Sequence, residues 1–360
     1  MKILYIITSL TMGGAENVLT NLADAIVAHG HEVKIAYLTG EASVLPSNPN
    51  VEVISLGIKQ NKDVLQGYIK LRALVKRMRP DVVHSHMFHS NLLARLLRLT
   101  ITIPKVICTS HSTDEGGQLR MFAYRLTDKL ANISTNVSQE AVDSLISKTS
   151  IAKHRMISVP NGIDTAKFTF DNSARILKRN ELKVEDAKVI LAVGRMHKDK
   201  DYPNLLNAIA SLKTLRQDFV VLIAGDGSLR ESMLSLTEKL GITDVVRFLG
   251  TRNDVSDLMS ASDVFVLSSS VEGFGLVVGE AMACQRVVVA TDCGGVKEVV
   301  GSQGFIVEPG NSEALASELN RSLDLNAVER SKLGATARQR IIDNFSLEAN
   351  VEAYLELYLA

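Results

Sequence analysis

Tryptophan is absent from this 360-residue chain, and Phe, Tyr and Trp together supply only 5 % of it. The core must therefore consist mainly of Ala, Val, Leu and Ile, which favours many buried strands and helices. Cysteine is scarce as well, since Cys108, Cys284 and Cys293 stand without paired spacing. This pattern argues against a disulfide framework and favours buried free thiols in a reducing cytoplasm.

Long hydrophobic runs are also lacking. No uncharged run exceeds 13 residues, the length of Ile3–Ala15, whereas a membrane-spanning helix needs about 20 apolar residues. The chain begins Met1-Lys2 and continues as a strand-like run, without the pattern of a secretory signal. We therefore expect a cytoplasmic protein without a transmembrane helix.

The chain has no net charge, because 40 Lys and Arg residues balance 40 Asp and Glu residues. The balance is uneven along the chain: residues 1–165 hold 18 basic and 13 acidic residues. Residues 59–105 hold ten basic and two acidic residues, a net charge of +8. That stretch favours contact with an anionic surface.

The length suggests two domains, and apolar strands alternate with amphipathic helices throughout. Residues 2–8 are typical of a buried parallel strand, residues 15–28 of a helix and residues 33–38 of the next strand. This βαβ order predicts an α/β fold with doubly wound sheets. The first turn lacks the full G-x-G-x-x-G pattern, so dinucleotide binding is only weakly indicated. The turn residues Pro160-Asn161-Gly162 place a domain boundary near residue 165.

One motif dominates the second half of the chain. Residues 263–267 are typical of a buried strand, which leads through Glu272-Gly273-Phe274-Gly275 into a helix that carries Glu280. The backbone N–H groups at a helix start and the helix dipole favour phosphate binding. Two carboxylates cannot bind phosphate, but they can accept hydrogen bonds from hydroxyl groups, as a sugar–diphosphate–ribose ligand requires. The alternative is a glycine turn with two solvated glutamates.

A second candidate site follows the strand predicted over residues 188–193. Gly194-Arg195-Met-His-Lys-Asp-Lys200 places two cations five residues apart. Arg binds phosphate through two hydrogen bonds and Lys acts as a point charge, so the pair can neutralise a departing diphosphate. The alternative is a solvated basic turn. Because the chain shows no convincing Asp-x-Asp motif, we expect catalysis without a metal.

Histidines mark the ends of two strands in the first half. His84 and His86 end one predicted strand and share one of its faces, His89 follows, and His111 ends the next strand. Ligands of open α/β sheets bind outside the carboxyl ends of strands. Histidines 84, 86 and 89 could also form a metal site, although no carboxylate or cysteine completes it nearby. A satisfied structural histidine is the alternative for His111.

The run E-G-F-G-L-x3-E-A-M-A-C over residues 272–284 resembles the retaining glycosyltransferases of family 4, which have the GT-B architecture. The resemblance continues through residues 289–300 and four separate upstream segments, so it covers most of the chain. It implies two Rossmann-like domains that face a central cleft. Residues 1–165 would form the acceptor-side domain and residues 166–343 the nucleotide-sugar domain. A terminal helix, residues 344–360, would cross back to the first domain.

The resemblance also implies roles for single residues. Glu280 would bind the ribose hydroxyls, Glu272 the hydroxyls of the donor sugar, and His111 the same sugar. The other assignments are Arg195 and Lys200 at the diphosphate, Gly273, Phe274, Gly275 and Leu276 at the phosphates, Asp226 and Arg252 near the base, Gly14 opposite the donor phosphates, and Gly13 and His86 on the acceptor side. Catalysis would rest on His111, Glu272, Arg195 and Lys200.

Two positions depart from the family pattern. Many members have Gly after the second cation, where this chain has Asp201. The family often has A-C-G-x-P after the second Glu, where this chain has Cys284-Gln285-Arg286-Val287. These departures leave the local turn geometry open.

By this resemblance the chain is a retaining glycosyltransferase that moves a hexose or N-acetylhexosamine from a nucleoside diphosphate sugar. A UDP-sugar is favoured over a GDP-sugar, and no cofactor or nucleic acid is expected. A same-face displacement, in which the leaving phosphate oxygen takes the acceptor's proton, is the mechanism commonly proposed for the class. A sugar-nucleotide epimerase of the GT-B fold and a non-catalytic sugar-nucleotide binder are the alternatives.

The basic stretch suggests where the acceptor comes from. Its cations include Lys70, Arg72, Lys76, Arg77 and Arg79 near one predicted helix, and Arg95 and Arg98 among leucines on the next. Cations among leucines suit an anionic membrane surface, and similar bacterial enzymes extend lipid-linked sugars there. We expect peripheral membrane binding and a lipid-linked saccharide acceptor in cell-surface polysaccharide synthesis. The alternative is that the leucines face the chain's own sheet.

Overall fold

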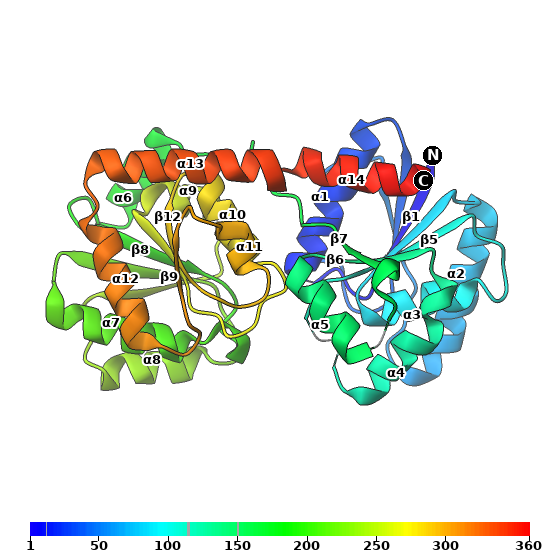
Figure 1. The fold of residues 1–360 in the computed structure, drawn as a ribbon, viewed down its shortest axis with the longest axis horizontal. Helices are drawn as coiled ribbons and strands as arrows, with labels where there is room; N and C mark the ends of the chain where they lie inside the picture. Colours follow the sequence, from blue (N-terminus) through cyan, green and yellow to red (C-terminus); the bar gives the residue numbers. More distant parts are fainter. Residues whose placement is uncertain (12, 114–115, 150) are drawn as a thin grey trace. The chain divides into compact units, whose positions relative to one another are not determined.

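The computed structural model describes residues 1–11, 13–113, 116–149 and 151–360. The chain forms two compact units, one made of Met1–Gly162 with Leu347–Ala360 and the other of Ile163–Ser346 (Figure 1). Each unit is built on one parallel sheet with helices on its faces. The predicted α/β class with two Rossmann-like domains is therefore confirmed.

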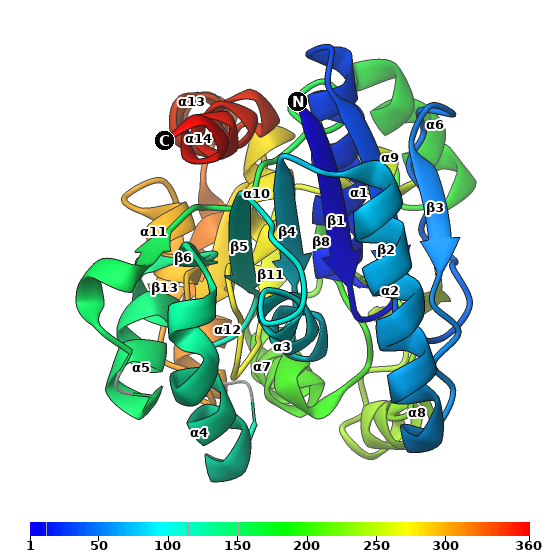
Figure 2. The same ribbon diagram turned by 90° about the vertical axis from the view of Figure 1, so that its right-hand side faces the viewer.

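The first unit contains a seven-stranded sheet in the order β3-β2-β1-β4-β5-β6-β7. Figure 2 shows its strands side by side, with α2, α3 and α4 along one face. The strands are β1 (Lys2–Ile7), β2 (Glu32–Tyr37), β3 (Glu52–Ser55), β4 (Val82–His86), β5 (Lys105–Ser110), β6 (Ile133–Asn136) and β7 (Met156–Ser158). The helices are α1 (Gly14–Ala28), α2 (Val64–Met78), α3 (Phe88–Leu97), α4 (Gln118–Thr127), α5 (Gln139–Thr149) and α14 (Leu347–Leu359), with 3₁₀ turns η1 (Asn61–Asp63), η2 (Asp128–Leu130) and η3 (Lys153–Arg155).

Aliphatic side chains cover both faces of this sheet. Alternate residues of β1 point to opposite faces, as in any strand: Ile3, Tyr5 and Ile7 pack with α1 and α14, whereas Leu4 and Ile6 pack with α2 and α3. In register, Ile7 lies beside His86, and His86 lies beside Thr109. The carboxyl ends of the central strands therefore meet at one edge, where the predicted histidines stand.

The second unit contains a six-stranded sheet in the order β10-β9-β8-β11-β12-β13. Its strands are β8 (Lys188–Val193), β9 (Phe219–Ala224), β10 (Val246–Gly250), β11 (Val264–Leu267), β12 (Val287–Thr291) and β13 (Phe305–Val307). Its helices are α6 (Asn172–Glu181), α7 (Tyr202–Leu215), α8 (Arg230–Lys239), α9 (Val255–Ala261), α10 (Leu276–Ala283), α11 (Val296–Val300), α12 (Ser312–Asp324) and α13 (Ala327–Phe345), with the 3₁₀ turn η4 (Lys198–Lys200).

The two departures from the family pattern take the conformation that glycine usually supplies. Gln285 has φ +59° at the end of α10, and Asp201 has φ +44° at the start of α7. Residues with a Cβ atom are strained in this left-handed region, which glycine adopts without strain. The turns thus keep their shape without glycine, and the Asp201 side chain also accepts a hydrogen bond from the Asn204 N–H group, at 3.3 Å.

Cys108, Cys284 and Cys293 are all buried. Over the described part of the chain, every helix is too short or too polar to cross a bilayer.

Candidate active site

The loop Gly194–Lys200 leaves β8 and is fixed against the loop after β9. The Gly194 N–H group donates to the Ala224 carbonyl oxygen at 3.0 Å, and the Met196 N–H group to the Asp226 carbonyl oxygen at 2.9 Å. The Met196 side chain is fully buried, whereas Arg195 is exposed. The side chain of Arg195 makes no hydrogen bond or ion pair with another residue that the structure describes, although its carbonyl oxygen accepts from the His197 N–H group at 2.8 Å. Its guanidinium is thus available to a ligand.

Glycine permits the close approach of these two loops. A Cβ atom on Gly225 would lie 2.0 Å from the Gly194 carbonyl oxygen, and one on Gly227 would lie 2.6 Å from that of Met196. The exposed Asp226 between them uses its carboxylate locally, accepting from the Gly227 N–H group at 2.7 Å. Gly225-Asp226-Gly227 therefore shapes the loop that carries Arg195, and the role of Asp226 near a base stays a prediction.

Lys200 and Glu272, predicted separately, are in contact. The Lys200 Nζ lies 2.5 Å from Glu272 Oε1, and the Ser269 hydroxyl donates to the same oxygen at 2.7 Å. Gly294 fixes the backbone at this point: it has φ +54°, and a Cβ there would lie 1.9 Å from the Glu272 carbonyl oxygen. One cation and one carboxylate thus occupy the carboxyl ends of β8 and β11 together.

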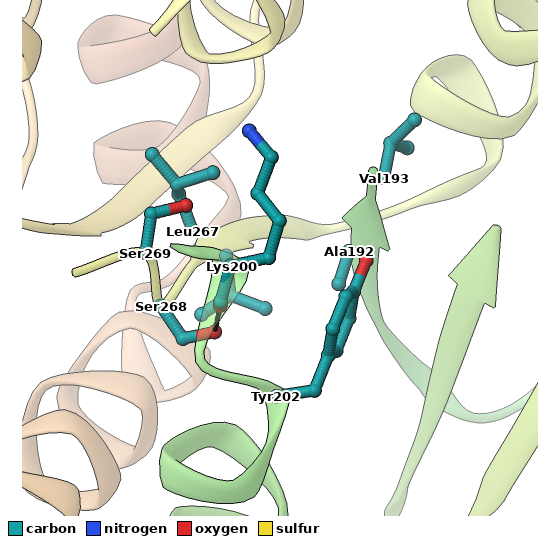
Figure 3. Close-up of a pocket in the computed structure, with 8 residues that line it drawn as sticks. Ala192, Val193, Lys200, Tyr202, Leu267, Ser268 and Ser269 are labelled. Carbon is teal, nitrogen blue, oxygen red and sulfur yellow. Dashed lines mark hydrogen bonds between the residues drawn. The ribbon is translucent and has the colours of Figure 1, made fainter. Parts of the chain in front are cut away.

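Lys200 also lines a small cavity at the ends of these strands (Figure 3). It has a volume of about 10 Å³, the room that one water molecule needs. Its polar groups come from Lys200, Ser268, Ser269 and Tyr202, whose hydroxyl donates to the Gly194 carbonyl oxygen at 2.9 Å. Burial raises the pKa of Tyr202, so its phenol stays neutral. Ser269 and Tyr202 were not among the predicted site residues, although the polar run Ser268-Ser-Ser270 after a strand was a signal.

Helix α10 begins where phosphate binding was predicted. Gly275, with φ +82°, precedes its first residue, Leu276, and no side chain caps this helix start. The buried Phe274 packs edge-on against Phe345, with ring centroids 5.7 Å apart. The turn around Gly273 is held by the Gly295 N–H group, which donates to the Gly273 carbonyl oxygen at 3.2 Å. The helix start is therefore fixed in position with no side chain occupying it.

Glu280 lies on α10 with a carboxyl group that has no hydrogen bond or ion pair to another described residue. Burial raises its pKa to about 8, against a weaker lowering by Lys167. The residue nevertheless keeps part of its surface accessible. Protein atoms thus crowd the carboxyl group on most sides, which raises its pKa, while one side stays open to a ligand.

Arg252 is engaged by carboxylates. Its guanidinium contacts both oxygens of Asp254, at 2.7 and 2.5 Å, and lies 3.5 Å from Glu181. These ion pairs raise the pKa of Arg252, the Asp254 hydrogen bond most of all. A contact with a nucleotide base would have to use the flat face of this paired group, and it stays a prediction.

In the first unit, α1 begins at Gly14, one residue after the extended Gly13. A Cβ on Gly13 would lie 2.3 Å from Glu16 Oε2, so a larger residue would displace that carboxylate. Glu16 is buried, and the Ser9 hydroxyl donates to its Oε1 at 3.2 Å. Glu16 was not among the predicted site residues, although its place three residues after the N-cap residue Gly13 was a signal.

The strand-end histidines form one cluster. His86 Nδ1 lies 2.9 Å from His111 Nε2, and His86 is only 1 % exposed. In this structure the His86 side chain is therefore buried behind His111. Its predicted contact with an acceptor would require the His111 side chain to move away. Burial lowers the pKa of His111 to about 4.

The histidines considered for a metal site have other partners. The two ring nitrogens of His84 bond to the Tyr358 hydroxyl at 2.7 Å and the Thr109 hydroxyl at 2.6 Å. His89 stands in α3 against the Phe88 ring. Among the described residues, no group of three or more His, Cys, Asp or Glu side chains is placed to hold a metal ion.

Comparisons with known proteins identify the family of the chain. The family described as Glycosyltransferase Family 4 matches residues 12–167, and Glycosyl transferases group 1 matches residues 173–340. The N-acetyl-alpha-D-glucosaminyl L-malate synthase of Bacillus anthracis is 25 % identical over 97 % of this chain and 94 % of its own length. The UDP-Gal:alpha-D-GlcNAc-diphosphoundecaprenol alpha-1,3-galactosyltransferase of Escherichia coli is 25 % identical over 82 % of this chain and 79 % of its own.

The solved structures show the same fold. The crystal structure of Anabaena HepE in complex with UDP superposes with a TM-score of 0.88, at 21 % identity over 99 % of both chains. Two family matches that together extend from residue 12 to residue 340, relatives along nearly the whole chain and a shared fold all point the same way. The chain therefore belongs to the glycosyltransferases of family 4, with the GT-B fold.

Proposed function

We propose that this glycosyltransferase retains the anomeric configuration and works without a metal, moving a hexose or N-acetylhexosamine from a nucleoside diphosphate sugar to a saccharide acceptor. The observation that supports it best is the Lys200–Glu272 pair at the carboxyl ends of β8 and β11, with the unpartnered Arg195 in the same loop. This places fixed positive charge where a diphosphate would leave and a carboxylate where sugar hydroxyls would bind.

The donor would bind mainly to the second unit. Arg195 and Lys200 would neutralise the diphosphate, and backbone N–H groups at the start of α10 would contact the same phosphates. Glu280 would accept hydrogen bonds from the ribose hydroxyls, since its open side lacks a protein partner. A UDP-sugar is the donor we propose; the Escherichia coli relative is named for UDP-galactose.

The reaction would exchange one bond for another on the same face of the sugar. The bond from C1 to the phosphate oxygen breaks, the bond from C1 to the acceptor oxygen forms, and the acceptor's proton passes to the departing phosphate oxygen. Lys200 and Arg195 stabilise the charge that develops on that phosphate. His111 would contact the donor sugar, and Gly13 and Gly14 would leave room for the acceptor.

A product analysis tests this proposal. The purified chain is given a panel of UDP- and GDP-sugars with lipid-linked saccharides, in excess chelator, and the product is examined by NMR. We expect release of UDP that depends on the acceptor, and an α-linked product from an α-configured donor. An inverted product would contradict retention, and loss of activity in EDTA with rescue by Mg²⁺ or Mn²⁺ would contradict metal-independent transfer.

We further propose a lipid-linked acceptor, presented at an anionic membrane surface. The relative from Escherichia coli is named for a diphosphoundecaprenol-linked acceptor. The structure corrects part of the predicted surface: Arg95 is 0 % exposed and bonds to Tyr124, Thr127 and Ser134, and Arg98 bonds to carbonyl groups of its own unit. Arg95 is therefore structural, because a buried guanidinium must be hydrogen-bonded, and the half-buried Arg98 is held by these carbonyl groups.

Helix α2 retains the features that membrane binding needs. Leu65 and Ile69 are 70 % and 56 % exposed one helical turn apart. Lys70, Lys76 and Arg77 on α2 are exposed as well, as is Arg79 directly after it. Apolar residues beside cations suit the interface of an anionic bilayer, at about 1 kcal/mol per cation near the surface.

Vesicle sedimentation at low and high salt tests the membrane proposal. The variant Arg72→Ser, Lys76→Ser, Arg77→Ser, Arg79→Ser should lose binding to phosphatidylglycerol vesicles. A matched control replaces four exposed cations of the second unit, Lys183, Lys239, Arg321 and Lys332, by Ser. Equal binding of the two variants, or no binding of the unchanged chain at low salt, would favour a soluble acceptor.

A further inference from the structure

His86 and His111 are in direct contact through their ring nitrogens. His86 ends β4, and His111 follows β5, the neighbouring strand. Their rings stack at 26° with centroids 5.2 Å apart, and His86 Nδ1 lies 2.9 Å from His111 Nε2. His111 is partly exposed, whereas His86 is 1 % exposed. The buried ring thus stands directly behind the accessible one.

The contact requires one hydrogen atom between the two nitrogens. Burial lowers the pKa of both residues well below neutrality, to about 4 for His111, so both rings are neutral at pH 7. A neutral imidazole has one N–H donor and one acceptor nitrogen. Therefore one of the two rings donates and the other accepts, and the choice fixes which nitrogen of His111 carries the proton.

The surroundings of His86 indicate the direction. Its other nitrogen, Nε2, is buried and has no hydrogen-bond partner among the described residues. Besides His111, the rings that lie close to His86 are His84, with centroids 4.3 Å apart, and Tyr5, at 5.9 Å. A proton on Nε2 would be a buried donor without an acceptor, which is the rarer case in proteins. A proton on Nδ1 instead donates to His111 and leaves only a lone pair unused.

We propose that His86 is a positioning residue that holds His111 in the tautomer protonated at Nδ1, so that His111 donates a hydrogen bond to an oxygen of the substrate sugar. The Nδ1 atom of His111 has no partner among the described residues. The substrate-side role of His111 rests on the proposed function, but the tautomer does not. His86 then acts through His111, without touching the substrate itself.

The tautomer can be read without any substrate. The full chain is labelled with ¹⁵N-histidine, and the ring nitrogens are observed by long-range ¹H–¹⁵N NMR, with the His111 signals identified by their loss in His111→Asn. We expect a protonated Nδ1 and a bare Nε2 on His111. A protonated Nε2 on His111 in the unchanged chain would overturn the proposal.

Three substitutions at His86 separate positioning from packing. An Asn amide can donate from the place of Nδ1, whereas Gln reaches the place of Nε2 and Leu fills the space without a donor. His86→Asn should keep the His111 tautomer and most of kcat/KM. His86→Gln and His86→Leu should lose the tautomer bias and lower kcat/KM by about tenfold or more, as loss of an orienting partner does. An unchanged His111 tautomer in both Gln and Leu variants would overturn the proposal.

Two further measurements distinguish loss of the fold from failure of the proposed function and from failure of the His86–His111 pairing. The unfolding midpoint, together with the UDP affinity that we assign to the second unit, identifies a variant that has merely lost its fold. Because Gln and Leu differ in polarity, either variant alone can test the tautomer if the other does not fold. If the unchanged chain transfers no sugar but its tautomer depends on His86, the proposed function fails and the pairing stands. If the tautomer changes in His86→Leu while kcat/KM does not, the substrate-side role of His111 is overturned.

Discussion

At the scale of single residues, the site combines groups that the fold has already paired with groups that it leaves open. Lys200 is bound to Glu272, which Ser269 also holds. Arg195 and Glu280 have no such partners among the described residues. The open groups are the ones from which a ligand can gain most, because they give up no protein contact to bind it.

Arg195 offers the cleanest test of the phosphate site. Arg195→Ala should lower kcat/KM by about 10²–10³-fold, equal to about 2.7–4 kcal/mol of transition-state stabilisation, if the guanidinium acts like an oxyanion-hole donor. Stability should not change, since the side chain is exposed. The matched control is Lys198→Ala, an exposed cation three residues away in the same loop. Steady-state kinetics that show equal losses in the two variants would indicate a general charge effect.

Glu280 makes stability depend on pH. Its pKa is raised to about 8 in the folded chain, above the ordinary value of 4.5. The unfolded chain then loses this proton first, so the stability contributed by the neutral carboxyl is complete below pH 4.5 and is lost as pH rises to 8. Glu280→Gln should therefore gain stability over the unchanged chain, progressively from pH 5 to pH 8. Urea unfolding at several pH values measures the difference in unfolding free energy between the variant and the unchanged chain, with Glu231→Gln at an exposed position as the control. A difference that does not vary with pH would contradict the raised pKa of Glu280.

Gln285 stores backbone strain that glycine would relieve. Its φ is +59°, in a region that costs an L-residue roughly 1–2 kcal/mol. Gln285→Gly should raise the free energy of unfolding by about 1 kcal/mol, whereas Gln285→Ala keeps the Cβ atom and should give no gain. Asp201→Gly should change it little, because the relief is offset by the lost cap of α7. Urea titrations compare the three, and a gain for Ala equal to that for Gly would argue against strain.

At the scale of helices and strands, sequence patterns predicted the buried elements well. The apolar run that became β8 was predicted with the observed bounds, and the terminal helix predicted over residues 344–360 contains α14. Helix α6 was not foreseen, because it is polar on average, none of its residues is buried, and even Ile176 and Leu177 are exposed. The contact of Lys200 with Glu272, 72 residues apart, could not be derived from spacing. It depends on the parallel pairing of β8 with β11, which only the fold determines.

Helix α14 is held to the first sheet by a buried hydroxyl. The Tyr358 hydroxyl bonds to His84 at 2.7 Å and to the Tyr5 hydroxyl at 3.0 Å. Tyr358→Phe leaves both groups buried without this partner, which should cost about 1–3 kcal/mol for each group left unsatisfied. Tyr68→Phe is the control, since its hydroxyl bonds to Thr100 at the surface. Thermal unfolding that shows equal, small losses would mean that α14 is held by apolar packing alone.

At the scale of the whole molecule, each unit has its own sheet and its own core. The core of the first unit includes Val351, Tyr354 and Tyr358 of α14. These residues lie far along the chain from residues 1–162, which form the rest of that unit. The units are therefore unequal: residues 163–346 form one continuous segment, whereas the first unit needs two.

Separate expression of the segments tests this difference. Residues 163–346 alone should unfold cooperatively and bind UDP. Residues 1–162 alone should bind the dye ANS through exposed apolar surface, and should lose that binding when residues 347–360 are added as a peptide or through a flexible linker. A peptide in which Val351, Tyr354 and Tyr358 are replaced by Ser is the control. Full cooperative unfolding of residues 1–162 alone would show that α14 is dispensable.

The division of the first unit between two stretches of chain also orders events during synthesis. Residues 1–162 leave the ribosome first, yet they wait for α14 until the whole of residues 163–346 has been made. In that interval the groove for α14, with Tyr5 and His84 at its base, is an open hydrophobic surface that a chaperone could occupy. Residues 163–346 can thus complete their fold before residues 1–162 do. Once α14 has been made, it covers the groove, and the first unit no longer needs the chaperone.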